Sequence, residues 1–330
     1  MKIAVIIPYF GDLPKNFELW YHSCAQNKSI DWFLITDNEI NLPKIDNIKI
    51  TNMSIADINN RIQSEIGEQY KISKPYKLCD FKPFYGLIFK DFVVNYDFWG
   101  YCDMDLIFGD LNNFLPIEKL KKTDMFQLWG HFTLIKNDDI LIKQIKRELN
   151  QLFNLDTILK SEVVWALDEF AMPAVMSKLN NIVLYNNSII ADIVPYNNKL
   201  YLSHCERKTN YIFRYDGKSI YGYYIDEKNT VAKKEFMYVH FQKRKLSVNV
   251  DINSNSNIYI TENSISNIEK IDIKEFLNKK YNKVEKIEMK FARIKNTVNK
   301  IWKLITERNL TKTIKYRKRC DELFVNKSSI

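Results

Sequence analysis

The chain has 330 residues, 46% of them hydrophobic and 27% charged, which is enough for one large α/β domain or a domain with an appendage. Eight glycines and eight prolines exclude collagen-like and low-complexity classes, and no apolar run approaches the roughly 18 residues of a membrane-spanning helix. The five cysteines are scattered, without a Cys-x-x-Cys pair, which predicts reduced thiols in a cytosolic protein.

The charge is unevenly distributed. The net charge is +9, and residues 279–330 hold 16 of the 49 basic and 5 of the 40 acidic residues, a net of +11. The rest of the chain therefore carries −2 and is nearly neutral. A basic tail of this kind indicates an anionic partner such as a membrane surface, another polyanion or nucleic acid.

The first 66 residues alternate between apolar runs and amphipathic segments. We expect strands at 3–7, 31–37 and 45–53, and helices at 16–27 and 55–66. Strand, helix and strand at this spacing indicate a parallel sheet. No Gly-x-Gly-x-x-Gly or Walker loop follows the first strand, so the dinucleotide and P-loop classes lose their main evidence.

The most informative stretch is 98–110. Asp103 and Asp105 stand two residues apart between an aromatic run and an apolar run. If a strand ends near Cys102, both acids lie at its carboxyl end, where open α/β sheets bind ligands. Two such acids repel each other unless a cation neutralises them, and oxygen ligands favour Mg²⁺ or Mn²⁺. A solvated turn is the alternative, but the bulky apolar flanks favour a metal–diphosphate site.

Further polar residues interrupt apolar segments. Lys77, Asp80 and Lys82 lie in the aromatic-rich stretch 74–90, where either an ion pair at a helix start or a polar cluster under a nucleotide would explain them. Gly130 and His131 lie in an apolar run at 126–135, which predicts another strand. His131 is either structural or part of an acceptor pocket. A helix is expected at 139–153.

Two later sites carry candidate chemistry. Asp168 and Glu169 stand among bulky apolar residues, and such surroundings raise a carboxyl pKa and suit a general base. A helix-start acid is the alternative. His240 ends a hydrophobic strand and precedes Lys243 and Arg244. It is either a third metal ligand beside cations that neutralise a diphosphate or a solvated strand end.

The composition of the C-terminal part of the chain predicts an appendage. Residues 251–267 are rich in Asn and Ser, which indicates a linker or irregular segment. A heptad stripe of apolar residues then runs from Val284 to Ile305 with basic residues on its other faces. We therefore expect a domain at 1–250, a linker at 251–267 and a basic helical extension at 268–330.

Seven stretches together resemble glycosyltransferases of the GT-A fold, and an uncharacterised bacterial family of cell-surface polysaccharide enzymes. They occur in the expected order and cover about residues 1–245. The stretches are IIPYFG at 6–11, LITD at 34–37, KLCDFKP at 77–83, GYCDMD at 100–105, GHF at 130–132, DE at 168–169 and HF at 240–241.

The resemblance implies a Rossmann-like nucleotide-sugar domain in which Asp103 and Asp105 hold a divalent cation on the diphosphate. Asp105 is the expected direct ligand. His240 resembles the third ligand of family 8 glycosyltransferases, although Gln-Lys-Arg at 242–244 replaces that family's Gly and Lys-Pro-Trp.

The resemblance also implies roles around this cation. The first loop contacts the base, Asp37 lies near the base or ribose, and the acidic pair Asp168 and Glu169 lies at the acceptor or anomeric centre. The residues expected to bind the sugar nucleotide are Pro8, Tyr9, Phe10, Asp37, Lys77, Asp80, Lys82, Asp103 and Lys243. Those expected to bind the acceptor are Gly130 and His131.

The reading that unites these expectations is a glycosyltransferase dependent on Mn²⁺ or Mg²⁺, moving a sugar from a UDP-linked donor to a glycan or lipid-linked acceptor in bacterial surface polysaccharide biosynthesis. We expect it in the cytoplasm, with residues 279–330 on an anionic membrane surface and no nucleic-acid partner. Retention and inversion both stay open. The alternatives are a basic-tailed lipid- or nucleic-acid-binding module, and a metal-dependent phosphotransferase or nuclease.

Overall fold

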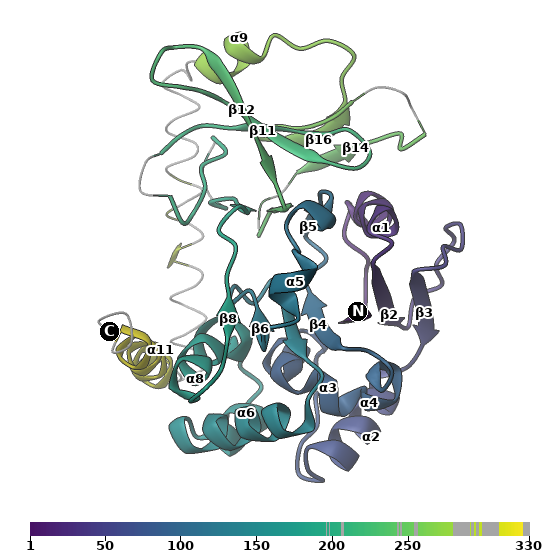
Figure 1. The fold of residues 1–330 in the computed structure, drawn as a ribbon, viewed down its shortest axis with the longest axis vertical. Helices are drawn as coiled ribbons and strands as arrows, with labels where there is room; N and C mark the ends of the chain where they lie inside the picture. The colour runs from purple at the N-terminus through teal and green to yellow at the C-terminus, as the bar shows by residue number, and fades with distance from the viewer. Residues whose placement is uncertain are drawn as a thin grey trace.

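The structure is a computed structural model. It describes residues 1–195, 197, 199–205, 208–242, 244, 246–253, 257–279 and 310–325, together with 291, 294, 297 and 298. Within these residues the fold is mixed α/β with a large, mostly parallel sheet at its centre (Figure 1), as the sequence predicts.

The central sheet has seven described strands in the order β3-β2-β1-β4-β7-β6-β8. Parallel pairing joins β1 to β2, β2 to β3 and β1 to β4, whereas β4–β7 and β6–β7 are antiparallel. The strands are β1 (Ile3–Pro8), β2 (Ile30–Thr36), β3 (Ile48–Asn52), β4 (Phe98–Cys102), β6 (Met125–Phe126), β7 (Phe132–Lys136) and β8 (Leu184–Tyr185).

Helices cover both faces of this sheet, which explains the continuous apolar runs of its parallel strands. Val5 and Ile7 pack with α1 (Phe17–Gln26) in one core, and Ala4 and Ile6 face a second core on the other side. Among the helices that contribute to the second core are α2 (Ile55–Glu65), α3 (Tyr85–Ile88), α4 (Lys90–Val93), α6 (Asp139–Leu152), α7 (Leu155–Lys160) and α8 (Met172–Lys178).

A second sheet has six described strands in the order β12-β11-β10-β15-β16-β14 and is nearly all antiparallel. It packs against α1 and β5. Its strands are β10 (Ile212–Tyr215), β11 (Ile220–Ile225), β12 (Val231–Phe236), β14 (Ser247–Asn249), β15 (Ile258–Ile260) and β16 (Ser264–Asn267). The short helix α9 (Ile273–Asn278) packs on this sheet. A small sheet consists of β5 (Leu106–Phe108), β13 (Tyr238–His240) and β9 (Ala191–Asp192), and its strand β5 lies beneath the six-stranded sheet (Figure 1).

Two expected elements differ from the structure, and the aromatic-rich stretch 74–90 begins with a helix of a particular type. Residues 126–135 do not form one strand, because Gln127 and Gly130 adopt positive φ angles and the chain reverses between β6 and β7. Within the segment expected to be a linker or irregular, residues 258–260 and 264–267 form the paired strands β15 and β16, which bury Ile258, Ile260 and Ile265. Residues 75–84 form a 3-10 helix, η1 (Pro75–Phe84), ahead of α3.

The C-terminal helix α11 (Leu310–Val325) packs on the body beside α8 (Figure 1). Tyr316 and Cys320 are buried in the second core, and the Tyr316 ring meets Trp165 edge-on at 5.3 Å between centroids. Most of the predicted heptad stripe lies outside the described residues, and its members Phe291, Ile294 and Val298 are exposed. Every helix in the described ranges is too short or too polar to cross a bilayer.

Candidate metal centre

The loop between β4 and β5 presents Asp103 and Asp105 at the carboxyl end of β4, as predicted. Backbone contacts hold this loop in place. The amide side chain of Asn16 donates to the Met104 carbonyl at 3.0 Å, and the Phe241 N–H donates to the Asp105 carbonyl at 3.0 Å. The two acids are therefore fixed by elements on either side rather than forming a free surface turn.

His240 reaches this loop because β13 pairs antiparallel with β5, placing His240 opposite Leu106. Its Nε2 lies 3.4 Å from Asp105 Oδ1. One ligand atom each from Asp103, Asp105 and His240 lies within 4.8 Å of the others. Two carboxylates and an imidazole converging in this way fit a divalent cation such as Mn²⁺.

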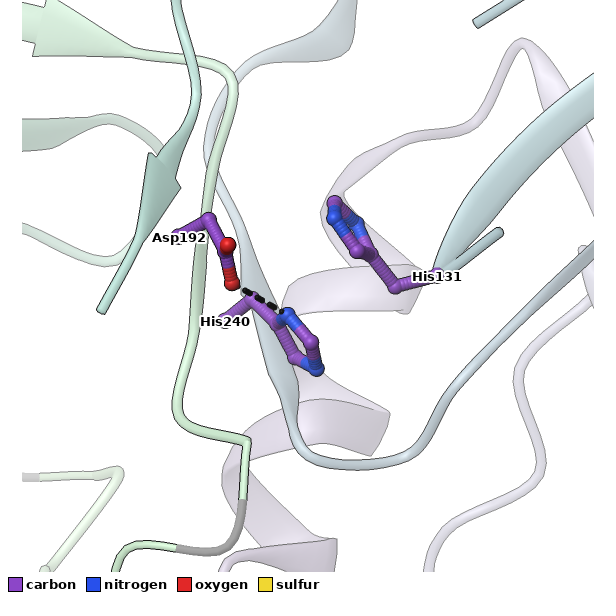
Figure 2. A group of neighbouring side chains, drawn as sticks. All are labelled: His131, Asp192 and His240. Carbon is purple, nitrogen blue, oxygen red and sulfur yellow. Dashed lines mark hydrogen bonds and ion pairs between the residues drawn. The ribbon is translucent and has the colours of Figure 1, made fainter. Parts of the chain in front are cut away.

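Asp192 on β9 completes the surroundings of His240 and was not predicted from the sequence. Its Oδ1 lies 2.8 Å from His240 Nδ1 (Figure 2). Burial opposes protonation of His240, but hydrogen bonds to Asp105 and Asp192 outweigh it and raise its pKa to about 10. In the sequence, the one feature that could have drawn attention to Asp192 is that it is a single acid inside the apolar segment 189–194. An acid inside a buried strand is a candidate functional residue.

Lys82 links the predicted metal ligands to the predicted catalytic acid. Its ammonium, nearly inaccessible to solvent, donates to Asp103 Oδ1 at 2.7 Å, to Asp168 Oδ2 at 2.6 Å and to the Gly130 carbonyl at 3.0 Å. One cation thus neutralises two carboxylates that come from distant parts of the chain. The arrangement agrees with the reading of Lys82 as part of a polar cluster at the site.

Asp168 lies in a π-helical turn, η3 (Leu167–Ala171), that follows Ala166 in a left-handed conformation. Its side chain is buried. Burial raises the pKa of Asp168 to about 7, against the opposing influence of the Lys82 ammonium. A carboxyl group poised near neutral pH can either accept or donate a proton.

Lys77 and Asp80 correspond to the first of the two expected alternatives, an ion pair at a helix start. They form a buried ion pair of 2.7 Å. Lys77 also donates to the Ile158 and Val163 carbonyls, each at 2.8 Å. Asp80 accepts from the backbone N–H groups at 165 and 167. Their partners are the protein's own backbone, so the pair holds the segment that leads into Asp168.

The first loop lies on the other side of the acids. Tyr9 is half-buried, and burial followed by the nearby Asp105 raises its pKa. Phe10 is buried in the second core, so its ring packs inside the protein and not toward a ligand. Asp37 accepts from the Gly11 N–H at 3.3 Å, which joins the end of β2 to this loop beyond Pro8.

Gly130, His131 and Glu169 form the opposite wall. Gly130 has φ +75°, and a Cβ added there would lie 2.7 Å from Cγ of Glu169, so the two residues are in close contact. His131 is buried, with Nδ1 at 3.0 Å from the Tyr238 hydroxyl and its ring 4.3 Å from that of His240. Glu169 is exposed.

The expected phosphate clamp after His240 is described only in part. Lys243 lies outside the described residues. The Arg244 guanidinium donates to the backbone carbonyls of residues 194, 197, 199 and 262, so it joins neighbouring loops. A half-open pocket of about 530 Å³ opens beside Asp105, with Lys15, Asn16 and Gln242 in its wall.

Comparison with solved structures gives distant resemblances. The glycosyltransferase GlyE of Streptococcus pneumoniae TIGR4 is 17% identical, with 57% of this chain and 45% of GlyE covered and a TM-score of 0.32. This chain thus spans less than half of GlyE. The galactosyltransferase LgtC, solved with donor and acceptor sugar analogues, is 12% identical over 59% of this chain and 76% of LgtC, with a TM-score of 0.33.

No curated protein matches the chain. A family model does match, over residues 5–269, and it is described as a family of unknown function, DUF6625. These residues include nearly all of the three sheets and all the candidate site residues. The protein therefore belongs to the DUF6625 family.

Proposed function

We propose that the protein is a metal-dependent glycosyltransferase of the GT-A type, acting on a nucleoside-diphosphate sugar with a UDP leaving group. The observation that carries the proposal is the convergence of Asp103, Asp105 and His240 at the carboxyl edge of a mostly parallel sheet, with Lys82 joining Asp103 to Asp168. Parallel α/β sheets bind ligands at this edge.

The three ligand side chains would hold Mn²⁺ or Mg²⁺. Such a cation stabilises the charge that develops on a departing diphosphate. The pocket beside Asp105 offers the Lys15 ammonium and the amides of Asn16 and Gln242, which suit phosphate oxygens. The diphosphate would therefore lie between the first loop and β13.

The chain's own acids would act at the sugar. Lys82 keeps Asp168 next to Asp103, while Glu169, beside it, is exposed and accessible to an acceptor. Proton transfer from the acceptor hydroxyl to Glu169 or Asp168 during in-line attack would invert the anomeric configuration. The wall formed by Gly130 and Glu169 would position that acceptor, a glycan or lipid-linked sugar of a surface polysaccharide.

Substitution of Asp105 tests the proposal. We expect Asp105→Ala to abolish Mn²⁺-dependent release of nucleoside diphosphate while the thermal unfolding temperature stays close to wild type, because Asp105 is partly exposed at the site. Asp31→Ala removes a carboxylate from the partly exposed ion pair with Lys49 and should leave the activity unchanged. A fully active Asp105→Ala variant would exclude this metal-site assignment.

We also propose peripheral contact of residues 279–330 with an anionic membrane, supported by their net charge of +11. Cosedimentation with phosphatidylglycerol vesicles tests it. Binding that survives deletion of residues 279–330 would refute the role of the tail. The deletion also removes α11, whose Tyr316 packs on Trp165, so thermal unfolding must first show that the truncated protein is folded.

A further inference from the structure

The Asp192 carboxylate is held beside His240 by strand pairing and by several hydrogen bonds. β9 pairs parallel with β13, and the register places Asp192 directly opposite His240. Oδ1 of Asp192 accepts from the Gln242 amide at 2.8 Å and lies 2.8 Å from His240 Nδ1. Oδ2 accepts from the Ser203 hydroxyl. The carboxylate is therefore fixed on both oxygens.

This geometry determines which nitrogen of His240 keeps its proton when the imidazole is neutral. An ionised carboxylate only accepts hydrogen bonds, so Nδ1 of His240 must donate to Asp192. In the neutral imidazole, Nε2 then keeps its lone pair. Nε2 is the atom that faces Asp105, at 3.4 Å. The ring is thus oriented with Nε2 toward Asp105, and when a cation displaces the proton from Nε2, the proton kept on Nδ1 leaves the tautomer that binds the cation.

We propose that Asp192 is a positioning residue that fixes the orientation and tautomer of His240 as the nitrogen ligand of the cation site. The inference rests on the proposed function, because it takes Asp103, Asp105 and His240 as the metal ligands. It also has a consequence for selectivity. A fixed imidazole adds a nitrogen donor that Mn²⁺ accepts, whereas Mg²⁺ depends on carboxylates and water.

The same side chains suggest a second arrangement. Ligand atoms of His131, Asp192 and His240 also lie within 4.8 Å of one another, and Figure 2 shows the three side chains at the corners of a triangle. An ion there would have to displace the bonds from His240 and Gln242 to Asp192 and compete with the Tyr238 hydroxyl for His131. The hydrogen-bonded arrangement favours Asp192 as an orienting group and one cation per chain.

The test measures metal binding directly, by Mn²⁺ titration with electron paramagnetic resonance and Mg²⁺ competition. Loss of an orienting carboxylate typically weakens metal binding about 10–100-fold, which we expect for Mn²⁺ in Asp192→Ala. The Mg²⁺ affinity should change less. Asp192→Asn should recover much of the Mn²⁺ affinity, because Oδ1 can still accept from His240 and Gln242 while the amide donates to Ser203.

Asp110→Ala serves as the matched control. Asp110 is also buried and hydrogen-bonded, to Asn112 and Lys218, but lies outside the candidate site. In a His240→Ala background, adding Asp192→Ala should cause no further loss, because Asp192 acts through the imidazole. Thermal unfolding checks each variant, and Asp192→Ser replaces Asp192→Ala if the latter does not fold.

The outcomes separate the two proposals. If the wild type binds no Mn²⁺, the metal-dependent function itself fails. If the wild type binds Mn²⁺ and a folded Asp192→Ala variant binds it equally well, only the positioning role fails. A stoichiometry of two ions per chain, reduced to one in Asp192→Ala, would also overturn the inference, since Asp192 would then be a ligand of a second ion.

Discussion

Lys82→Met is the most informative single change, because the methionine fills similar space but removes the charge between two carboxylates. The ammonium bonds to Asp103, Asp168 and the Gly130 carbonyl, and the Lys82 residue is only 5% exposed. Removing one partner of a buried ion pair costs about 3–5 kcal/mol. We expect Lys82→Met to lower the free energy of unfolding by this amount at pH 8, because the variant has no counter-charge for an ionised Asp168.

The loss should depend on pH in a defined direction. The pKa of Asp168 is raised to about 7 in the folded protein, against about 3.9 for an unfolded chain, so its contribution to stability declines as pH rises through this interval. Without Lys82 the folded-state pKa rises further, and the decline continues above pH 7 at up to about 1.4 kcal/mol per pH unit. The deficit of the variant should therefore grow by about 1.4 kcal/mol from pH 6 to pH 8.

Urea unfolding of both proteins at pH 6 and pH 8 gives the two deficits. Adding Asp168→Asn should recover more than half of the loss at pH 8, because a neutral amide needs no counter-charge. Lys49→Met is the control: Lys49 and Asp31 form a partly exposed ion pair, worth at most about 1 kcal/mol. A Lys82→Met variant as stable as wild type at pH 8, or one whose deficit is independent of pH, would refute the reasoning.

Two further changes test the packing around the site. Tyr316→Ala should lower the free energy of unfolding by about 3–5 kcal/mol, because Tyr316 is buried against Trp165; no change in urea unfolding would mean that α11 does not dock there. Gly130→Ala should destabilise the protein more than Gly217→Ala. Both glycines have positive φ angles, but a Cβ at Gly130 collides with Glu169, whereas one at Gly217 meets nothing within 4 Å. Equal thermal unfolding temperatures would contradict the close contact.

The parallel half of the fold could be predicted from sequence because its signals are local. Residues 3–7 and 31–37 are continuous apolar runs, as expected of strands covered on both faces. The placement of Asp103 and Asp105 followed from the strand that precedes them. The antiparallel sheet was not predicted, because its strands are short and two of them lie in the Asn- and Ser-rich segment 251–267.

The site was predictable only where one residue could be recognised by its own flanks. His240 follows a hydrophobic strand, and it lies beside Asp105 as expected. Asp192 could not be connected with His240, because their contact depends on β9 pairing with β13 across 48 residues. Lys82 was grouped with Lys77 and Asp80 by sequence proximity. In the structure, those two bind each other and the backbone, while Lys82 alone reaches Asp103 and Asp168.

The most direct test of the proposed function is the release of nucleoside diphosphate from a panel of nucleotide sugars, with and without Mn²⁺. The account predicts Mn²⁺-dependent release of UDP from one donor by the wild type, and none by Asp105→Ala. Release from no donor, together with binding of DNA or anionic lipid by the basic tail, would contradict it and favour a binding module. Cleavage of bare nucleotides or DNA at the same site would favour a phosphotransferase or nuclease.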